Sequence, residues 1–198
     1  MQFEKTQTFQ NLARSFAGEC QAGMRYQFVA QLAEKEGKIA LRNLIKTIAK
    51  NETAHAKAFF DKMHEHASGQ IGKVEFTADF PYSAGSLEEG LRFSAIAEDE
   101  EAERVYPAFR DKAREEGYED IALLYERIIL VEQAHRQTFD ALFEDVRAKT
   151  LYKAEKPRTW KCSNCGNEGE GKTAWATCPL CGMKQGYVEI PVPNEEEA

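Results

Sequence analysis

The chain has 198 residues, of which 42% are hydrophobic and 30% are charged, and its formal net charge is -7. This length allows one core of moderate size with a small appended domain, and the negative charge argues against nucleic-acid binding, which depends on clustered Lys and Arg. Residues 1–10 contain no apolar signal segment and the longest aliphatic run is only residues 128–131, so we expect a cytoplasmic protein without membrane contact.

Four long helices are predicted over the first 150 residues, where apolar residues recur at helical spacing with breaks at 36–38, 67–86 and 116–118. Each helix would have roughly 30 residues and a length of about 45 Å. Gly37 and Gly117 predict tight turns, so the helices form two antiparallel hairpins. The segment 67–86 could extend up to about 65 Å, which lets the second and third helices run parallel.

The two hairpins form an internal repeat. A shift of 80 residues superimposes Gly37 on Gly117, and it carries the pair Glu52 and His55 onto Glu132 and His135. Self-similarity of this kind predicts a bundle with pseudo-twofold symmetry, in which the repeated Glu-x-x-His pairs face the centre.

Glutamate and histidine residues occupy positions on all four helices where core residues belong. Counting from the turns places all of them within about 6 Å along the bundle, roughly one helical turn. Burying five carboxylates together would cost several kcal/mol each, and two divalent cations would offset most of that charge. The predicted ligands are Glu19, Glu52, His55, Glu98, Glu101, Glu132 and His135.

A single Glu-x-x-His on an acidic helix usually lies on a solvent-exposed face. The prediction of a metal site therefore depends on the two repeated pairs occurring at the same level as three more glutamates. One carboxylate from each of two helices and Glu-x-x-His from each of the others is the ligand set of ferritin-like dinuclear proteins, and Glu101 is an addition to it. Oxygen and imidazole ligands suit iron or manganese, and two such ions can deliver two electrons to one oxygen-oxygen bond. Dioxygen or peroxide is therefore the expected substrate.

A small second domain is predicted after a polar linker at residues 154–157, because Pro157 would end any helix. This domain covers residues 158–193, and residues 194–198 form an acidic tail. Two Cys-x-x-Cys pairs with 12 residues between them can close a tetrahedral sulfur site; the ligands are Cys162, Cys165, Cys178 and Cys181. The spacing leaves zinc, iron and disulfides open, but a redox-active dinuclear site favours iron, which donates single electrons.

With these motifs, the whole chain resembles the rubrerythrin family, in which a ferritin-like diiron four-helix bundle precedes a rubredoxin-like domain. The resemblance implies a mainly α fold, with the bundle at residues 1–153 and a small β domain at 158–193. The motifs that carry it are Phe16-Ala17-Gly18-Glu19, Glu52-x-x-His55, Glu98-x-x-Glu101 with Tyr106-Pro107, Glu132-x-x-His135 and the two Cys-x-x-Cys pairs.

The resemblance also implies which ligands would bridge the two irons and which would bind only one. Glu52 and Glu132 would bridge two irons, and one iron would exchange Glu101 for His55 on reduction, which gives these last two a catalytic part. The terminal ligands would be Glu19, Glu98 and His135.

The sequence also gives expectations for two tyrosines and one cysteine near the ligands. By resemblance, Tyr26 and Tyr106 would donate hydrogen bonds to the ligands and take part in catalysis, although packing in the core accounts for them equally well. Cys20 departs from the family pattern, in which we expect a hydroxyl residue, and its side chain is expected to pack between helices.

The activity that the resemblance implies is reduction of hydrogen peroxide to water in oxidative-stress defence. The tetrathiolate iron would return electrons singly to the diiron site, and the upstream donor would be a rubredoxin reductase or other protein that uses NADH or NADPH. Because the linker is short, the small domain would serve a partner subunit in a head-to-tail homodimer or a tetramer.

Two other functions fit parts of the sequence. Iron oxidation and storage of the ferritin kind would use the same bundle, but the appended cysteine domain would obstruct a closed shell. A zinc-ribbon interaction module on a helical scaffold would use the cysteines and leave the seven inward ligands without a role.

Overall fold

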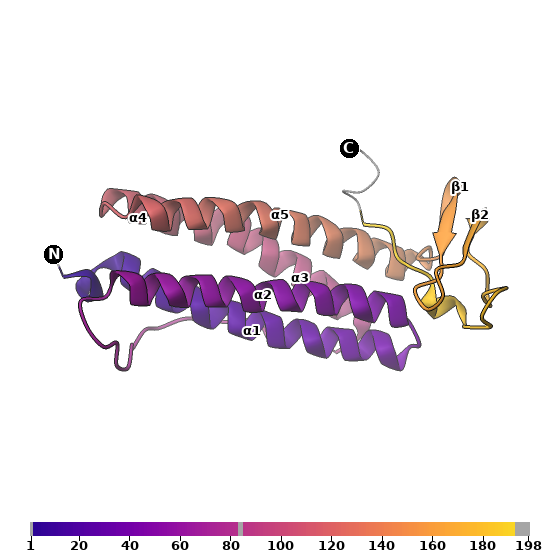
Figure 1. The fold of residues 1–198 in the computed structure, drawn as a ribbon, viewed down its shortest axis with the longest axis horizontal. Coiled ribbons are helices and arrows are strands. Elements are labelled where there is room, and N and C mark those ends of the chain that lie inside the picture. The colour runs from indigo at the N-terminus through magenta and orange to yellow at the C-terminus, as the bar shows by residue number, and fades with distance from the viewer. Residues whose placement is uncertain (1, 83–84, 193–198) are drawn as a thin grey trace.

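The computed structural model describes residues 2–82 and 85–192, so the expected tail at 194–198 lies outside the described residues. A four-helix bundle fills most of the structure and a small β domain lies at one end (Figure 1). The third long helix is continuous through a π-helical turn, Glu101–Val105, that joins α3 to α4. The helices are α1 (Gln7–Lys35), α2 (Ile39–His66), α3 (Leu87–Glu100), α4 (Tyr106–Glu115) and α5 (Glu119–Ala148).

The same glycine turn closes both hairpins. Gly37 and Gly117 have φ angles of 72° and 88°, the left-handed region in which glycine carries no steric cost. The following residue donates its backbone N–H to a carbonyl five residues back, from Lys38 to Ala33 at 2.9 Å and from Tyr118 to Ala113 at 2.8 Å. The two turns expected from the sequence are therefore present.

The segment between α2 and α3 travels along the bundle, so these two helices run in the same direction, as expected (Figure 1). The described part of this crossover has no helix or strand. Ile71, Val74 and Phe76 anchor it by packing against the buried core. None of the helices in the described residues is both long and apolar enough to cross a membrane.

Two hydrophobic clusters fill the bundle, one toward each end. Val29, Leu41 and Leu91 belong to the cluster near the α1–α2 turn, whereas Leu12 and Phe59 belong to the cluster at the other end. The expected ligands fall between these two sets of residues along every helix. Burial of apolar surface, which contributes about 25 cal/mol per Å², therefore stabilises the bundle on both sides of an acidic layer.

The small domain contains one antiparallel ladder, in which β1 (Lys153–Lys161) pairs with β2 (Glu168–Thr173). The register shifts between Lys153 and Arg158, so the residues expected to form a linker, 154–157, lie inside β1 at this irregularity. Trp160 and Val188 are buried in a separate core.

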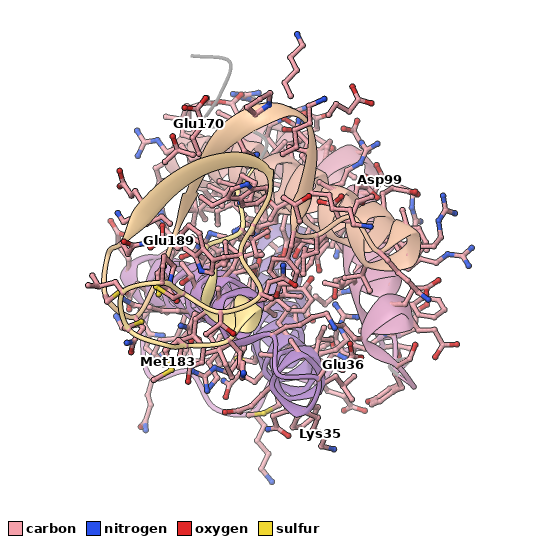
Figure 2. All side chains as sticks on the ribbon, turned by 90° about the vertical axis from the view of Figure 1, so that its right-hand side faces the viewer. Lys35, Glu36, Asp99, Glu170, Met183 and Glu189 are labelled. Atoms are coloured by element: carbon pink, nitrogen blue, oxygen red, sulfur yellow. The ribbon has the colours of Figure 1, made fainter. Side chains whose placement is uncertain are left out.

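The small domain packs against the end of the bundle at the α1–α2 turn. A Cβ atom at Gly186 would overlap the carbonyl oxygen of Gly37, so the two backbones are in close contact. Leu151 is buried in the nearby bundle cluster, and Ile190 packs against the same cluster. Figure 2 looks at this end, where Met183 and Glu189 of the small domain lie in front of the helices.

Candidate metal centres

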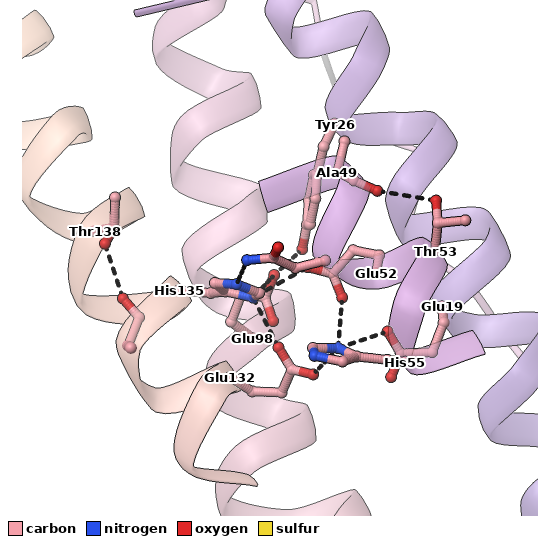
Figure 3. A network of polar contacts seen from close by, with 12 residues as sticks. Glu19, Tyr26, Ala49, Glu52, Thr53, His55, Glu98, Glu132, His135 and Thr138 are labelled. Atoms are coloured by element: carbon pink, nitrogen blue, oxygen red, sulfur yellow. Dashed lines mark hydrogen bonds and ion pairs between the residues drawn. The ribbon is translucent and has the colours of Figure 1, made fainter. Parts of the chain in front are cut away.

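Six of the seven expected bundle ligands meet in two overlapping clusters at the centre of the bundle (Figure 3). Within each cluster the potential ligand atoms all lie within 4.8 Å of one another. The four glutamates of these clusters have no exposed surface. One cluster contains Glu19, Glu52, His55 and Glu132, and the other contains Glu52, Glu98, Glu132 and His135.

Helix geometry brings each glutamate and its histidine together. Residues three apart share one helix face, so Glu52 and His55 both project from α2 into the bundle, as Glu132 and His135 do from α5. The antiparallel hairpins then set the two pairs opposite each other. Figure 3 shows all four side chains converging between the helices.

Glu52 and Glu132 belong to both clusters, and each turns one oxygen toward each imidazole. The Nδ1 atom of His55 lies 3.3 Å from Glu52 Oε2 and 2.9 Å from Glu132 Oε1. The Nδ1 atom of His135 lies 3.0 Å from Glu52 Oε1 and 2.9 Å from Glu132 Oε2. A cation in each cluster would therefore share both carboxylates.

Glu19 and Glu98 close the outer side of the two clusters. Glu19 Oε2 lies 3.5 Å from His55 Nδ1, and Glu98 Oε1 lies 3.9 Å from His135 Nδ1. The buried hydroxyl of Tyr106 donates a hydrogen bond to Glu19, and that of Tyr26 donates one to Glu98. The tyrosines also pack in the core, so they hold the carboxylates and fill space together.

The π-helical turn corrects the register of the third helix. Tyr26 follows Glu19 by seven residues, whereas Tyr106 follows Glu98 by eight. A π turn contains one extra residue, and the turn at Glu101–Val105 lies between this second pair. Glutamate and tyrosine therefore occupy matching positions in the two hairpins.

Glu101 begins this turn and stands apart from both clusters in the described residues. Its carboxylate faces the backbone of α1, since a Cβ atom at Gly18 would lie 3.8 Å from Glu101 Oε1. His55, in contrast, has its Nδ1 atom among the carboxylates of the first cluster. The structure thus has the imidazole inside the site and the carboxylate beside it.

Burial and neighbouring charges shift the pKa values of the clustered carboxyl groups. Burial raises the pKa of Glu19 and Glu98 well above the usual range and raises the pKa of Glu101 to about 8. Burial also acts to raise the pKa of Glu52, but contacts with His135 and His55 outweigh it and lower this pKa to about 2.

Neighbouring carboxylates raise the pKa values of both imidazoles. Burial alone would lower their pKa values, but contacts with Glu132 and other carboxylates outweigh it and raise the pKa of His55 to about 12. The same carboxylate contacts raise the pKa of His135 to about 9. Metal ligands must be deprotonated, so a cation that binds here would displace protons from these groups.

Unsatisfied polar atoms show that this site fits metal ions. A buried polar atom without a hydrogen bond costs about 1–3 kcal/mol, and several such atoms line the two clusters. Oxygen and imidazole nitrogen are suitable ligands for iron. The atoms are Oε2 of Glu19, both carboxylate oxygens of Glu52, Nδ1 of His55, Oε2 of Glu98 and Oε1 of Glu132.

Sequence reasoning missed Asn51, whose Nδ2 atom lies 3.2 Å from Nε2 of His135. A metal on Nδ1 leaves the proton on Nε2, and Asn51 would then accept it through its amide oxygen after an amide flip. The internal repeat contains no signal for this contact, because the equivalent residue in the second hairpin is Val131.

The four cysteines of the small domain form a second cluster. The Sγ atoms of Cys162 and Cys181 are 3.7 Å apart, as are those of Cys165 and Cys178. A tetrahedral site with metal-sulfur bonds of about 2.3 Å has sulfur-sulfur distances of about 3.8 Å, far longer than a disulfide bond. The backbone N–H of Met183 lowers the pKa of Cys181 to about 6, which favours the thiolate.

Cys20 does not pack between helices as expected. Its side chain is exposed on α1, although it directly follows the buried Glu19. The helix turns about 100° per residue, and this rotation carries the thiol to the solvent face.

Comparisons with known proteins agree with both metal centres. The rubrerythrin family model matches residues 10–143 and 89–162, and the model of the rubrerythrin rubredoxin-like domain matches residues 160–189. Rubrerythrin-1 of Clostridium acetobutylicum is 35% identical over 189 residues, covering 96% of each chain. Rubrerythrin of Porphyromonas gingivalis is 37% identical over 185 residues, covering 93% of this chain and 90% of its own.

Solved structures share the fold. A mixed-valence nigerythrin has a TM-score of 0.62 and 24% identity, covering 94% of this chain and 90% of its own. A bacterioferritin of Mycobacterium tuberculosis has a TM-score of 0.59 and 17% identity, covering 75% of this chain and 90% of its own. The chain thus combines a ferritin-like bundle containing the residues of a diiron carboxylate site with a rubredoxin-like four-cysteine site. On the family model and on these relatives, the chain belongs to the rubrerythrin family.

Proposed function

We propose that this protein reduces hydrogen peroxide to water at a carboxylate-bridged diiron site, in defence against oxidative stress. The observation that carries the proposal is the position of Glu52 and Glu132, each of which turns one oxygen to each of two imidazoles. Bound ferrous ions would supply the two electrons of the reaction H₂O₂ + 2 e⁻ + 2 H⁺ → 2 H₂O.

The side chains around this centre have separate roles. Glu52 and Glu132 would bridge the irons, with His135 as a terminal ligand together with Glu19 and Glu98. Tyr106 and Tyr26 hold these last two carboxylates by hydrogen bonds and so preserve the site geometry between oxidation states. The apolar clusters on both sides keep bulk water from the centre.

His55 and Glu101 are the residues that we expect to exchange on one iron. His55 reaches the first cluster in this structure, and Glu101 lies on a π turn beside it. π turns lack the regular hydrogen bonds of an α-helix and are frequent at functional sites. A carboxylate on such a turn would be able to take the place of the imidazole as a ligand of bound iron.

Electrons would enter through the four-cysteine site, which binds a single iron in this proposal and receives them from an NADH- or NADPH-dependent reductase. The small domain contacts the α1–α2 turn, and His55 lies eighteen residues from Gly37 along α2, about 27 Å away. This separation within one chain favours transfer to the diiron site of a partner subunit in a head-to-tail dimer. The protein would work in the cytoplasm.

Stopped-flow mixing of the iron-loaded, anaerobically reduced protein with hydrogen peroxide tests the proposal. Both iron centres should lose their reduced spectra, with two electrons removed from the diiron site per peroxide. Slow or absent oxidation would contradict peroxide reduction. Full peroxidase activity in a preparation that contains zinc as its only metal would contradict it as well. Native mass spectrometry gives a second test, because a closed multi-subunit shell would indicate iron storage instead.

A further inference from the structure

A cavity of about 340 Å³ opens beside Glu101, between α1, the α3–α4 helix and residues 78–81 of the crossover. Its size lies at the lower end of the range for small-molecule pockets, and it is far larger than hydrogen peroxide requires. Phe80, Phe93 and Phe109 line it with apolar surface. We call this space the Arg25 cavity.

Arg25 lines this cavity and has unused hydrogen-bond donors. Its side chain is only 7% exposed, and its Nε and Nη1 atoms have no hydrogen-bond partner in the described residues. The third nitrogen, Nη2, lies 3.4 Å from the hydroxyl of Tyr26, a long contact. Its guanidinium carbon lies over the Tyr26 ring, 5.2 Å from the ring centroid, and this contact uses none of the N–H donors. A buried guanidinium with two N–H groups left without acceptors is costly, so this one is suited to a ligand with oxygen acceptors.

The charges around the cavity argue against a carboxylate as that ligand. Arg14 and Arg25 supply two positive charges, and Asp79 and Glu100 supply two negative ones, so the lining around Glu101 is close to neutral. A neutral head group that both accepts and donates hydrogen bonds matches this lining better. A hydroperoxide, R–O–O–H, can accept from the Arg25 guanidinium and donate to a carboxyl oxygen of Glu101.

We propose that the Arg25 cavity binds organic hydroperoxides with an apolar body, which the protein reduces in addition to hydrogen peroxide. The inference rests on the proposed function for its source of electrons. The aromatic walls hold the apolar body, and the oxygen atoms lie toward Arg25 and Glu101. The reaction is ROOH + 2 e⁻ + 2 H⁺ → ROH + H₂O; the oxygen-oxygen bond breaks, and the two electrons would come from the ferrous ions of the proposed function.

Binding is tested without turnover by titrating 2-phenyl-2-propanol, the product of cumene hydroperoxide reduction, into metal-free and iron-loaded protein under ligand-observed NMR. Arg25→Gln should bind about tenfold more weakly, as loss of a hydrogen bond to a charged donor predicts. Ala78→Phe places a ring in the cavity lining and should weaken binding to a similar extent.

Two matched variants serve as controls because their residues are exposed and do not line the cavity. Thr77→Phe adds the same ring one residue away, and Arg92→Gln removes the same charge from α3. Both should bind the alcohol as the unmodified protein does. Equal binding by all variants, absence of binding, or binding of benzoate in place of the alcohol would overturn the proposal. Ala78→Phe keeps the test valid if Arg25→Gln does not fold.

Kinetics separate this inference from the proposed function. The ratio of kcat/KM for cumene hydroperoxide to that for hydrogen peroxide should fall about tenfold in Ala78→Phe, in line with the loss of binding. If the unmodified protein reduces hydrogen peroxide but not cumene hydroperoxide, only the inference about the Arg25 cavity fails. If it reduces neither, the proposed function fails with it.

Discussion

At the scale of single residues, function depends on carboxylates that the fold keeps in an apolar interior. Glu52 and Glu132 each contact two imidazoles, and both are fully buried. Buried charges of this kind are stable only when paired or bound to metal. These two side chains therefore need either the imidazoles or bound cations as partners.

Removing one shared carboxylate should empty the bundle site. We expect Glu132→Gln to bind fewer than half of the iron ions that the unmodified bundle binds, because both clusters lose a negatively charged ligand. Metal analysis after anaerobic iron loading measures this. Glu144→Gln, an exposed change on the same helix, should leave the iron content as it was. Full iron content in Glu132→Gln would contradict the ligand assignment.

The tyrosine hydroxyls should contribute to stability in a measurable way. Tyr106→Phe removes the donor to Glu19 and should destabilise the protein by about 1–3 kcal/mol, which lowers Tm by roughly 3–10 °C for a chain of this size. Circular dichroism during heating gives the shift. Tyr118→Phe is the control, since its hydroxyl has no hydrogen bond among the described residues, and an equal effect there would argue against the assigned role.

Stability of the metal-free protein should fall as pH rises from about 5 to 9. Glu101 has a folded-state pKa of about 8 and His135 one of about 9, both above their unfolded values. The folded state therefore holds more protons over this range, and its stability declines as they leave. Metal ligands must be deprotonated, so added Mn²⁺ should raise Tm more at pH 8 than at pH 6. Thermal unfolding with EDTA or Mn²⁺ checks both trends; a metal-free Tm that rises with pH would refute them.

At the scale of elements, two glycine turns and one π turn set the level of the ligands. The glycine turns bring the helices of each hairpin into register, and the π turn Glu101–Val105 shifts the third helix by one residue. Without that shift Glu98 and Tyr106 would not match Glu19 and Tyr26. The geometry of the diiron site therefore depends on two glycine turns at the ends of the bundle and on one π turn beside the site.

The turn at Gly117 offers a direct test at this scale. Gly117→Ala adds a Cβ atom to a residue with a φ of 88° and should cost about 1–2 kcal/mol. Gly72→Ala is the matched control, because Gly72 has open space and no positive φ in the described crossover. Urea denaturation of both variants measures the difference. Equal stability would show that the turn tolerates a side chain.

At the scale of the whole molecule, the small domain sits against the end of the bundle remote from its own diiron site. The contact between Gly186 and the α1–α2 turn leaves no room for a side chain. Leu151 and Ile190 add apolar contact at the same end. The placement separates the two centres of one chain, which is the reason to expect electron transfer between subunits.

Gly186→Ala should release the small domain from the bundle. The added Cβ atom would overlap the Gly37 carbonyl, whereas Gly171→Ala in the same domain makes only ordinary contacts. We expect faster proteolysis between residues 149 and 157 in Gly186→Ala and unchanged cleavage in Gly171→Ala. Cleavage at the same rate in both would mean that the contact does not hold the domains together.

The sequence alone determined the four helices, their turns and the inward glutamates and histidines, because helical periodicity and glycine preference are local properties. It also determined the cysteine cluster, since four thiols at this spacing carry their own geometry. The family resemblance depends on these same residues.

Only the tertiary structure decided which groups meet across helices. Asn51 reaches His135, Cys20 faces solvent, residues 154–157 enter a strand, and His55 lies in the site while Glu101 lies beside it. The Arg25 cavity likewise forms from three segments distant in sequence. The Asn51 contact, the places of His55 and Glu101, and the cavity depend on packing between elements far apart in the chain, which no local pattern of residues encodes.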